Sequence, residues 1–403
     1  MPVVRLPPEV WQPIIRYATD SPDLLSTTWG YEPDLQLWQG WAEDDNSRVE
    51  LRTKLSIVHV CRAWRDMSIE YLYEVIHIPH SNNRSQVDSL VATFSDSAAV
   101  SLTGKGYGWW IKRITCSDRF LSLYHIDQLF PLLQRCQNLQ TFSFSTTYPN
   151  LHPQKQNQLV QLLEHRFYHS LRRVEFYTSS DSDSWRNERT IPQVAGLTSL
   201  GITLPQVTSS DSQAPPQSLT SLSINFPDSL TSFPSGWEFL SLKNLSIQNI
   251  SRQNFGHLIP FIKRHQTTLV NLHISSRSAV GVMIASLVSS APEVSSISLD
   301  DVGLYTFDTR QRIGITLLRL THLGITCVTQ NRDSLLRAKL GLLRVIGGEL
   351  VPNIKVVRFL NATSPVNSES SSTWLQMIEG CKNVGVRLED RRGKLICVGT
   401  PRI

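Results

Sequence analysis

The chain has 403 residues, of which 18% are charged and 40% are hydrophobic, a balance typical of soluble globular proteins and not of disordered chains. Its net charge of +5 is small for this length, and the basic cluster at residues 387–394 is interrupted by Glu389 and Asp390. We therefore expect no nucleic-acid partner. No apolar run reaches the length of a membrane span, and the N-terminus lacks the apolar region of a secretory signal, so no membrane partner is expected.

The six cysteines are scattered and form no CxxC pair. This spacing favours reduced thiols over a disulfide framework or a zinc site, and it predicts a cytoplasmic or nuclear location. The length allows two or three compact domains.

The first predicted helix begins near Pro8 and contains the apolar pair Ile14 and Ile15. Proline suits the first helical position because its missing N–H would have no partner there. Glu9 in the first turn meets the positive end of the helix dipole. Pro13 should remove a hydrogen bond and clash with the carbonyl of Glu9, which predicts a kink or a short helix.

Residues 54–73 form the second apolar segment. Apolar side chains recur at every third position, on one face of a helix: Leu55, Val58, Cys61 and Trp64. Ile57 and Val60 widen this stripe beyond what one core contact needs. A second short apolar helix follows over residues 67–73. Such a segment needs cover from its own chain, from another protein, or from both.

Together, residues 6–9, 14–15, 60–65 and 72–73 resemble the F-box motif in order and spacing, most closely that of fungal F-box proteins with a repeat-rich C-terminal half. The resemblance implies a three-helix module that binds a Skp-family adaptor of a cullin–RING ubiquitin ligase. It implies adaptor contacts by Leu6, Pro7, Ile14, Val58, Val60, Trp64 and Leu72. An internal core role is an equal alternative for Trp64.

An insert at about residues 20–50 is longer than the usual link between the halves of an F-box. It is rich in acidic residues and contains Trp29, Trp38 and Trp41. That aromatic content is too high for a plain disordered linker. The insert either folds back over the module or forms a separate contact surface.

From about residue 109 the pattern apolar-x-x-apolar-x-apolar recurs with a mean spacing of about 27 residues, within the range of leucine-rich repeats. The copies are 111–116, 139–144, 171–176, 197–202, 219–224, 242–247, 269–274, 294–299, 320–325, 354–359 and a degenerate copy from 384. Helical patterns precede several copies, at 123–133, 159–167, 258–265, 282–288 and 335–345. A repeated strand and helix build a solenoid, since stacked neighbours bury the apolar face that no repeat can bury alone.

These copies resemble the leucine-rich repeats of F-box proteins. The predicted fold class is therefore α/β: an F-box-like three-helix module, then an irregular leucine-rich-repeat solenoid with parallel strands and outer helices. We assign residues 1–79 to the F-box-like domain with its insert, 80–107 to a connector, 108–390 to the solenoid and 391–403 to a C-terminal tail.

Side chains alternate along a strand, so the residues flanking the inward apolar pair should point to the exposed concave side. If this side binds a target, charged and aromatic members are the expected anchors, because such residues dominate hot spots. These are Arg173, Tyr177, His273 and His322. A solvated sheet without a ligand is an equal alternative.

No catalytic constellation stands out in the sequence, and we expect neither an enzyme nor a cofactor. His165 and His169 have the i, i+4 spacing of a zinc pair, but Arg166 replaces the glutamate of a zincin, which favours a surface pair without metal. The resulting hypothesis is a substrate-recognition subunit of an SCF-type (cullin–RING) ubiquitin ligase that binds an adaptor and a protein target. The alternative is a stand-alone repeat scaffold whose N-terminal helices cap the solenoid.

Overall fold

The computed structural model describes seventeen segments of the chain. These are residues 7–19, 45–78, 84–95, 106–118, 123–146, 153–178, 191–203, 216–226, 237–250, 252–276, 286–300, 304–305, 317–327, 332–346, 351–360, 371–390 and 395–396. They group into two compact units, and the boundary between Leu200 and Gly201 falls inside strand β5 (Ser199–Thr203). The predicted insert lies almost entirely outside the described residues.

Unit 1 begins with three helices, α1 (Pro8–Thr19), α4 (Asp45–Val60) and α5 (Arg62–Tyr73). Their shared core includes Ile15 and Val58, and the rings of Trp11 and Trp64 pack 4.8 Å apart. The helix α1 continues through Pro13 to Thr19, so Pro13 does not end the helix. Three helices at these positions are compatible with the predicted module.

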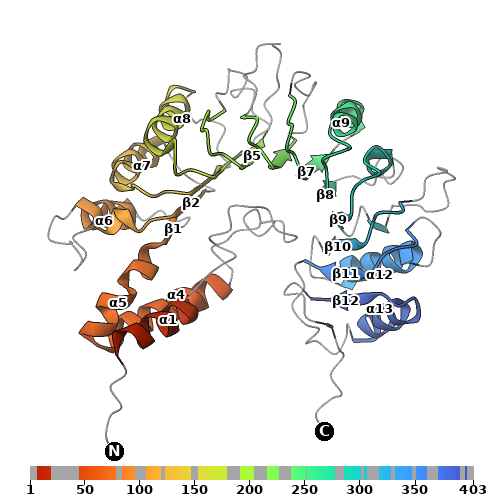
Figure 1. The fold of residues 1–403 in the computed structure, drawn as a ribbon, viewed down its shortest axis with the longest axis horizontal. Coiled ribbons are helices and arrows are strands. Elements are labelled where there is room, and N and C mark those ends of the chain that lie inside the picture. Colours follow the sequence, from red (N-terminus) through yellow and green to blue (C-terminus); the bar gives the residue numbers. More distant parts are fainter. Residues whose placement is uncertain are drawn as a thin grey trace, which may run out of the picture. The chain divides into compact units, whose positions relative to one another are not determined.

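Four strands of unit 1 follow and pair in parallel in chain order. They are β1 (Val75–Ile78), β2 (Arg113–Asp118), β3 (Thr141–Thr146) and β4 (Arg173–Thr178). Helices α6 (Arg84–Ser95), α7 (Leu123–Arg135) and α8 (Pro153–Phe167) lie on one side of these strands (Figure 1). Fully buried side chains such as Phe142, Leu132 and Leu163 form the core of this unit. The pairing of β1 with β2 starts the parallel sheet before residue 108.

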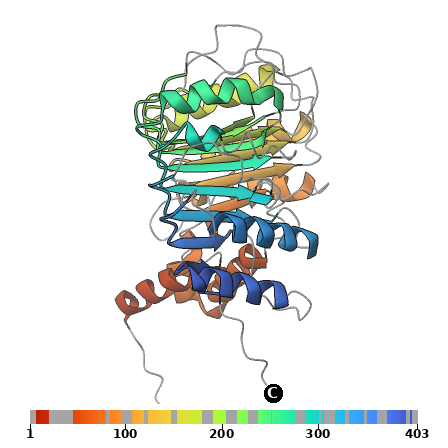
Figure 2. The same cartoon turned by 90° about the vertical axis from the view of Figure 1, so that its right-hand side faces the viewer.

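Unit 2 likewise has parallel strands in chain order, and they lie side by side in Figure 2. Its strands are β6 (Ser221–Asn225), β7 (Asn244–Ile250), β8 (Asn271–Ser276), β9 (Ser296–Asp300), β10 (His322–Thr326), β11 (Val356–Phe359) and β12 (Arg387–Glu389). Helices α9 (Arg252–Arg264), α12 (Arg332–Ile346) and α13 (Ser371–Asn383) lie on one side of these strands (Figure 1).

The repeat pattern located the strands correctly. From β2 to β11, each strand begins two residues after the start of a predicted copy, and its second and fourth residues pack inward, as Leu222 and Ile224 do in β6. The helical patterns at 123–133, 159–167, 258–265 and 335–345 are confirmed. The pattern at 282–288 lies partly outside the described residues, and α13 was not predicted. The fold is thus α/β with parallel strands and outer helices, compatible with a solenoid. None of the described helices is long and apolar enough to cross a membrane.

Replacement by alanine at two glycines inside helices should have opposite effects on the stability of the protein. A Cβ atom at Gly341 of α12 would lie 2.7 Å from the backbone of Leu304, whereas a Cβ at Gly256 of α9 meets nothing within 4 Å. We expect Gly341→Ala to destabilise the protein by about 1–3 kcal/mol through overpacking. Gly256→Ala should stabilise it by about 0.5–1 kcal/mol through helix propensity. Urea denaturation of the two variants measures the difference, and equal effects would contradict the tight packing at Gly341.

Candidate functional site

In both units a row of polar side chains follows the sheet on the face opposite the helices. Side chains alternate along a strand, so the residues between the inward apolar positions point to this second face. The strand register aligns them across neighbouring strands. In unit 1 the aligned residues are His77, Thr115, Ser143 and Glu175. In unit 2 they are Ser223, Ser246, His273 and Ser298.

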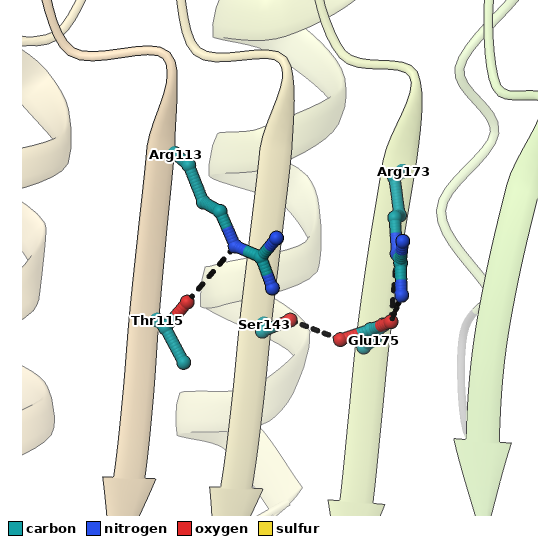
Figure 3. Close-up of polar contacts among 5 residues, drawn as sticks. All are labelled: Arg113, Thr115, Ser143, Arg173 and Glu175. Atoms are coloured by element: carbon teal, nitrogen blue, oxygen red, sulfur yellow. Dashed lines mark hydrogen bonds and ion pairs between the residues drawn. The ribbon is translucent and has the colours of Figure 1, made fainter. Parts of the chain in front are cut away.

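Unit 1 holds a buried ionic cluster on this face (Figure 3). The Arg173 Nε atom donates to Glu175 Oε1 at 2.7 Å, and Arg173 Nη2 donates to the same oxygen. The Ser143 hydroxyl donates to the other carboxylate oxygen of Glu175. Arg173 and Glu175 have no exposed side-chain surface. Both carboxylate oxygens are thus engaged, and the cluster fixes three side chains of β3 and β4 as a rigid group.

A second buried guanidinium lies two strands away. Arg113 Nε donates to Thr115 Oγ1 at 3.2 Å, and the guanidinium extends over β3 (Figure 3). His77 lies on the adjacent strand β1. Burial, and secondarily the charge of Arg113, lowers the pKa of His77 to about 4. This end of the face therefore has two fixed positive charges, one fixed negative charge and a neutral imidazole.

In unit 2 the corresponding row carries no charge. Ser223 has no exposed surface, and Ser246 and His273 are 4% and 6% exposed. The His273 Nδ1 atom lies 2.5 Å from Ser298 Oγ, while His273 Nε2 and the hydroxyls of Ser223 and Ser246 make no hydrogen bond within the described residues. Burial lowers the pKa of His273 to about 4, so its imidazole is neutral near pH 7. Three consecutive strands thus carry buried hydrogen-bonding atoms without partners.

Amide side chains form a ladder beside this row. Asn271 Nδ2 donates to Asn244 Oδ1 at 2.6 Å, and Asn244 Nδ2 donates to Ser221 Oγ at 2.8 Å. At the other edge, Asn249 Nδ2 donates to Asn225 Oδ1 at 2.5 Å. Asn249 has a φ of 57°, a left-handed conformation that asparagine tolerates, where the register of β7 shifts. This part of the face therefore bonds amide to amide and amide to hydroxyl.

The geometry supports hydrogen bonding better than catalysis. A serine nucleophile needs a base that accepts its proton, and on this face Ser298 Oγ lies 2.5 Å from His273 Nδ1, whereas Ser246 makes no such contact with its register partner His273. A pKa of about 4 also makes His273 a weak base at neutral pH. Within the described segments, no group of three or more His, Cys, Asp or Glu side chains is placed to hold a metal ion.

The four predicted target anchors divide between the units. Arg173 and Tyr177 lie in β4 of unit 1, and His273 and His322 lie in unit 2. Arg173, Tyr177 and His273 are buried, which corrects the expectation that they point to an exposed surface. His322 is partly buried, and its Nδ1 lies 2.8 Å from Thr321 Oγ1. Burial, followed by the charge of Arg358, lowers the pKa of His322.

Sequence reasoning placed Glu175, Ser223 and Ser246 on this face but did not single them out. Glu175 is the hydrogen-bond partner of the predicted anchor Arg173, and Ser223 and Ser246 have small side chains. The usable signal was the alternation of side chains between the two faces of a strand, which puts Arg173 and Glu175 on one face of the same strand. Their hydrogen bond and burial depend on packing that the period does not encode.

The predicted adaptor residues occupy different environments. Ile14 and Val60 are 47% and 58% exposed, whereas Val58 is buried. Pro7 is exposed, and Trp64 and Leu72 are partly buried. The packing of Trp64 on Trp11 gives it an internal role. Leu6 lies outside the described residues.

Comparison with known proteins adds no relative. No protein-family model matches the chain, and the curated proteins contain no match to its sequence.

Proposed function

We propose that this protein is a substrate-recognition subunit of an SCF-type ubiquitin ligase. Its N-terminal helices bind a Skp-family adaptor, and its leucine-rich-repeat-like units bind a protein target. The resemblance of residues 6–9, 14–15, 60–65 and 72–73 to the F-box motif supports the first part. The parallel strands with outer helices support the second part. The observation that carries the proposal is a set of exposed apolar side chains on the N-terminal helices.

These side chains lie on α1 and α4. On α1 they are Val10, Ile14 and Tyr17, at 41%, 47% and 89% exposure, with the i, i+4, i+7 spacing of one helix face. On α4 they are Leu51, Leu55 and Val60, at 49%, 38% and 58% exposure. Covering one such side chain contributes at most roughly 1.5–3 kcal/mol, so several together can support a complex of ordinary affinity.

The proposed mechanism is proximity. A target held on the repeats experiences the charged ubiquitin carrier of the ligase at a high effective concentration. This chain then makes and breaks no covalent bond itself.

Adaptor capture tests the proposal. We expect full-length protein to co-purify with a Skp-family adaptor, and the Ile14→Asp/Val60→Asp double variant to reduce capture by at least about 100-fold, because two apolar contacts are replaced by desolvated charges. Both positions are exposed in the free protein, so folding should be unaffected. The readout is the amount of adaptor retained on immobilised protein.

A double variant with the same chemistry elsewhere serves as the control. Leu240 and Leu318 are exposed apolar residues of unit 2, at 72% and 63%. Leu240→Asp/Leu318→Asp should retain adaptor as the wild type does. Equal, negligible capture by wild type and by the Ile14→Asp/Val60→Asp variant would refute the proposal.

Three contacts at the end of α5 favour the alternative of a scaffold with capping helices. Tyr73 at the end of α5 stacks on Tyr107 at a ring distance of 4.5 Å, and the Phe94 ring of α6 packs against Tyr73 at 5.7 Å. The backbone N–H of Arg113 donates to Glu74 O at 3.0 Å. The end of α5 therefore supports the first strands of the sheet, as a cap does. Stable folding without any adaptor capture would favour this second function.

A further inference from the structure

The C-terminal end of the polar face in unit 2 differs from the rest of that face by its charge. On the described strands β6 to β9, the face positions include no Arg or Lys, and Asp300 is the one carboxylate among them. On β11 and β12 the face positions include Arg358, Arg387 and Glu389. These two strands are neighbours at the end of the sheet (Figure 2). Positive charge on this face is therefore concentrated at one end.

The positive side chains at this end are open to solvent. The Arg387 side chain is 67% exposed and that of Arg358 is 23% exposed. Lys355, which directly precedes β11, is also exposed. We call these three residues the C-terminal cationic cluster. The charges of all three act on the neighbouring imidazole of His322, which is itself only partly buried. A ligand can therefore contact the cluster without any opening of the sheet.

One buried carboxylate holds the cluster without neutralising it. Glu389 Oε2 accepts from Arg358 Nη2 at 2.8 Å and from Arg358 Nε at 3.2 Å. The other oxygen of Glu389 lies 3.7 Å from Arg387 Nη2, which is too long for a hydrogen bond. The cluster carries three positive charges against the one negative charge of Glu389. Positive charges still outnumber negative ones by three to two when Asp390, which follows β12, is included.

We propose that the C-terminal cationic cluster binds carboxylate side chains of an acidic polypeptide segment. The inference rests on the proposed function, because it names the chemistry of the target that unit 2 holds. The exposed guanidinium of Arg387 offers paired N–H donors that match one carboxylate. Arg358 is fixed in place by Glu389 and supplies the second positive charge.

The spacing of the two arginines fits acidic residues at alternate positions of an extended segment. Arg387 pairs in register with Val356, two residues before Arg358 on the neighbouring strand. Adjacent strands lie about 4.8 Å apart and two residues of a strand span about 6.6 Å, so the Cα atoms of the two arginines are about 8 Å apart. Alternate residues of an extended peptide are about 6.8 Å apart and point to the same side.

A carboxylate fits the cluster better than a phosphate or a nucleic acid does. The charge of Glu389 within the cluster repels a doubly charged phosphate more strongly than a singly charged carboxylate. A nucleic acid requires a basic stripe along the protein and aromatic rings for base stacking. The face positions of β6 to β9 carry no positive charge, and those of β10 to β12 include no Phe, Tyr or Trp.

Fluorescence anisotropy with the full-length protein tests this assignment. The probe is a short fluorescein-labelled peptide of alternating glycine and glutamate, and the same peptide with glutamine is the neutral reference. A phosphoserine peptide and a single-stranded DNA oligonucleotide represent the competing classes of ligand. We expect the glutamate peptide to bind at least about tenfold more tightly than each of the other three probes. Its affinity should fall as the salt concentration rises from about 0.05 M to about 0.5 M, because salt screens exposed charges.

Arg387→Gln is the decisive variant. It removes one exposed positive charge, so it should weaken binding of the glutamate peptide at least about tenfold and leave the melting temperature unchanged. Arg319→Gln is the matched control. The Arg319 side chain is 66% exposed and pairs with Glu293 outside the cluster, so its removal should leave peptide binding intact.

Four results would overturn the proposal: equal binding of the glutamate and glutamine peptides, an affinity independent of salt, equal effects of Arg387→Gln and Arg319→Gln, or tighter binding of the phosphoserine peptide or the oligonucleotide. Adaptor capture depends on α1 and α4 and does not involve this cluster. Loss of adaptor capture with intact peptide binding would refute the ligase function alone, and the reverse pattern would refute the target chemistry alone.

Discussion

Glu175→Ala is expected to destabilise the protein by about 3–5 kcal/mol. The substitution removes the carboxylate that Arg173 and Ser143 share, in a cluster where Arg173 and Glu175 have no exposed side-chain surface. A buried guanidinium that loses its carboxylate keeps its desolvation cost and loses the compensating attraction. Chemical denaturation followed by circular dichroism measures the change.

Two controls separate this effect from the mere loss of an ion pair. Asp127→Ala breaks the pair between Asp127 and Lys155, which are 53% and 36% exposed, and should cost no more than about 1 kcal/mol. Arg173→Met/Glu175→Leu replaces both buried charges by apolar groups and should recover most of the lost stability. A Glu175→Ala cost as small as that of Asp127→Ala would show that the cluster is hydrated and only weakly coupled.

Acid should weaken the fold through His273. The imidazole binds a proton with a pKa of about 4 in the folded chain and near 6.5 when unfolded. Between these values the unfolded state takes up the proton and the folded state does not. The resulting stability is complete above about pH 6.5 and is lost as the pH falls toward 4, by about 3 kcal/mol in total.

Denaturation of wild type and His273→Gln at several pH values measures this contribution. Glutamine stays neutral, so the variant should lose about 3 kcal/mol less than wild type between pH 6.5 and pH 4. His169→Gln, at an exposed histidine, should follow the wild type. Parallel curves for wild type and His273→Gln would mean that the imidazole is protonated in the folded chain, and the neutral row of unit 2 would then be wrong.

The repeat pattern predicted the strands because burial imposes it directly. Leu222 and Ile224 face the helices and are buried, so these two positions must be apolar. The same requirement in each copy produces the repeated spacing of apolar residues that the sequence shows. Helix α13 was not foreseen because its sequence begins with Ser371, Ser372 and Thr373, which read as the end of a loop. The helix α1 runs through Pro13, so the local penalty of a proline inside a helix does not end it there.

The sequence predicted on which face of the sheet the polar side chains lie, but not their burial or their contacts. Alternation placed Arg173 and His273 opposite the helices, and the strand register aligns His273 with the polar residues Ser246 and Ser298 of the neighbouring strands. Their burial follows from long-range packing. The contacts between Arg173 and Glu175, and between His273 and Ser298, likewise depend on side-chain conformations that no local pattern determines.

The order of the strands has an evolutionary consequence. Among the described strands of each unit, each strand pairs in parallel with the strands that adjoin it in the chain. Tandem duplication or loss of one strand–helix pair would therefore lengthen or shorten the array without rerouting the backbone, whereas the same event in a closed barrel would break its closure. Such a change in the number of strand–helix pairs would lengthen or shorten the polar face of the sheet without altering the remaining pairs.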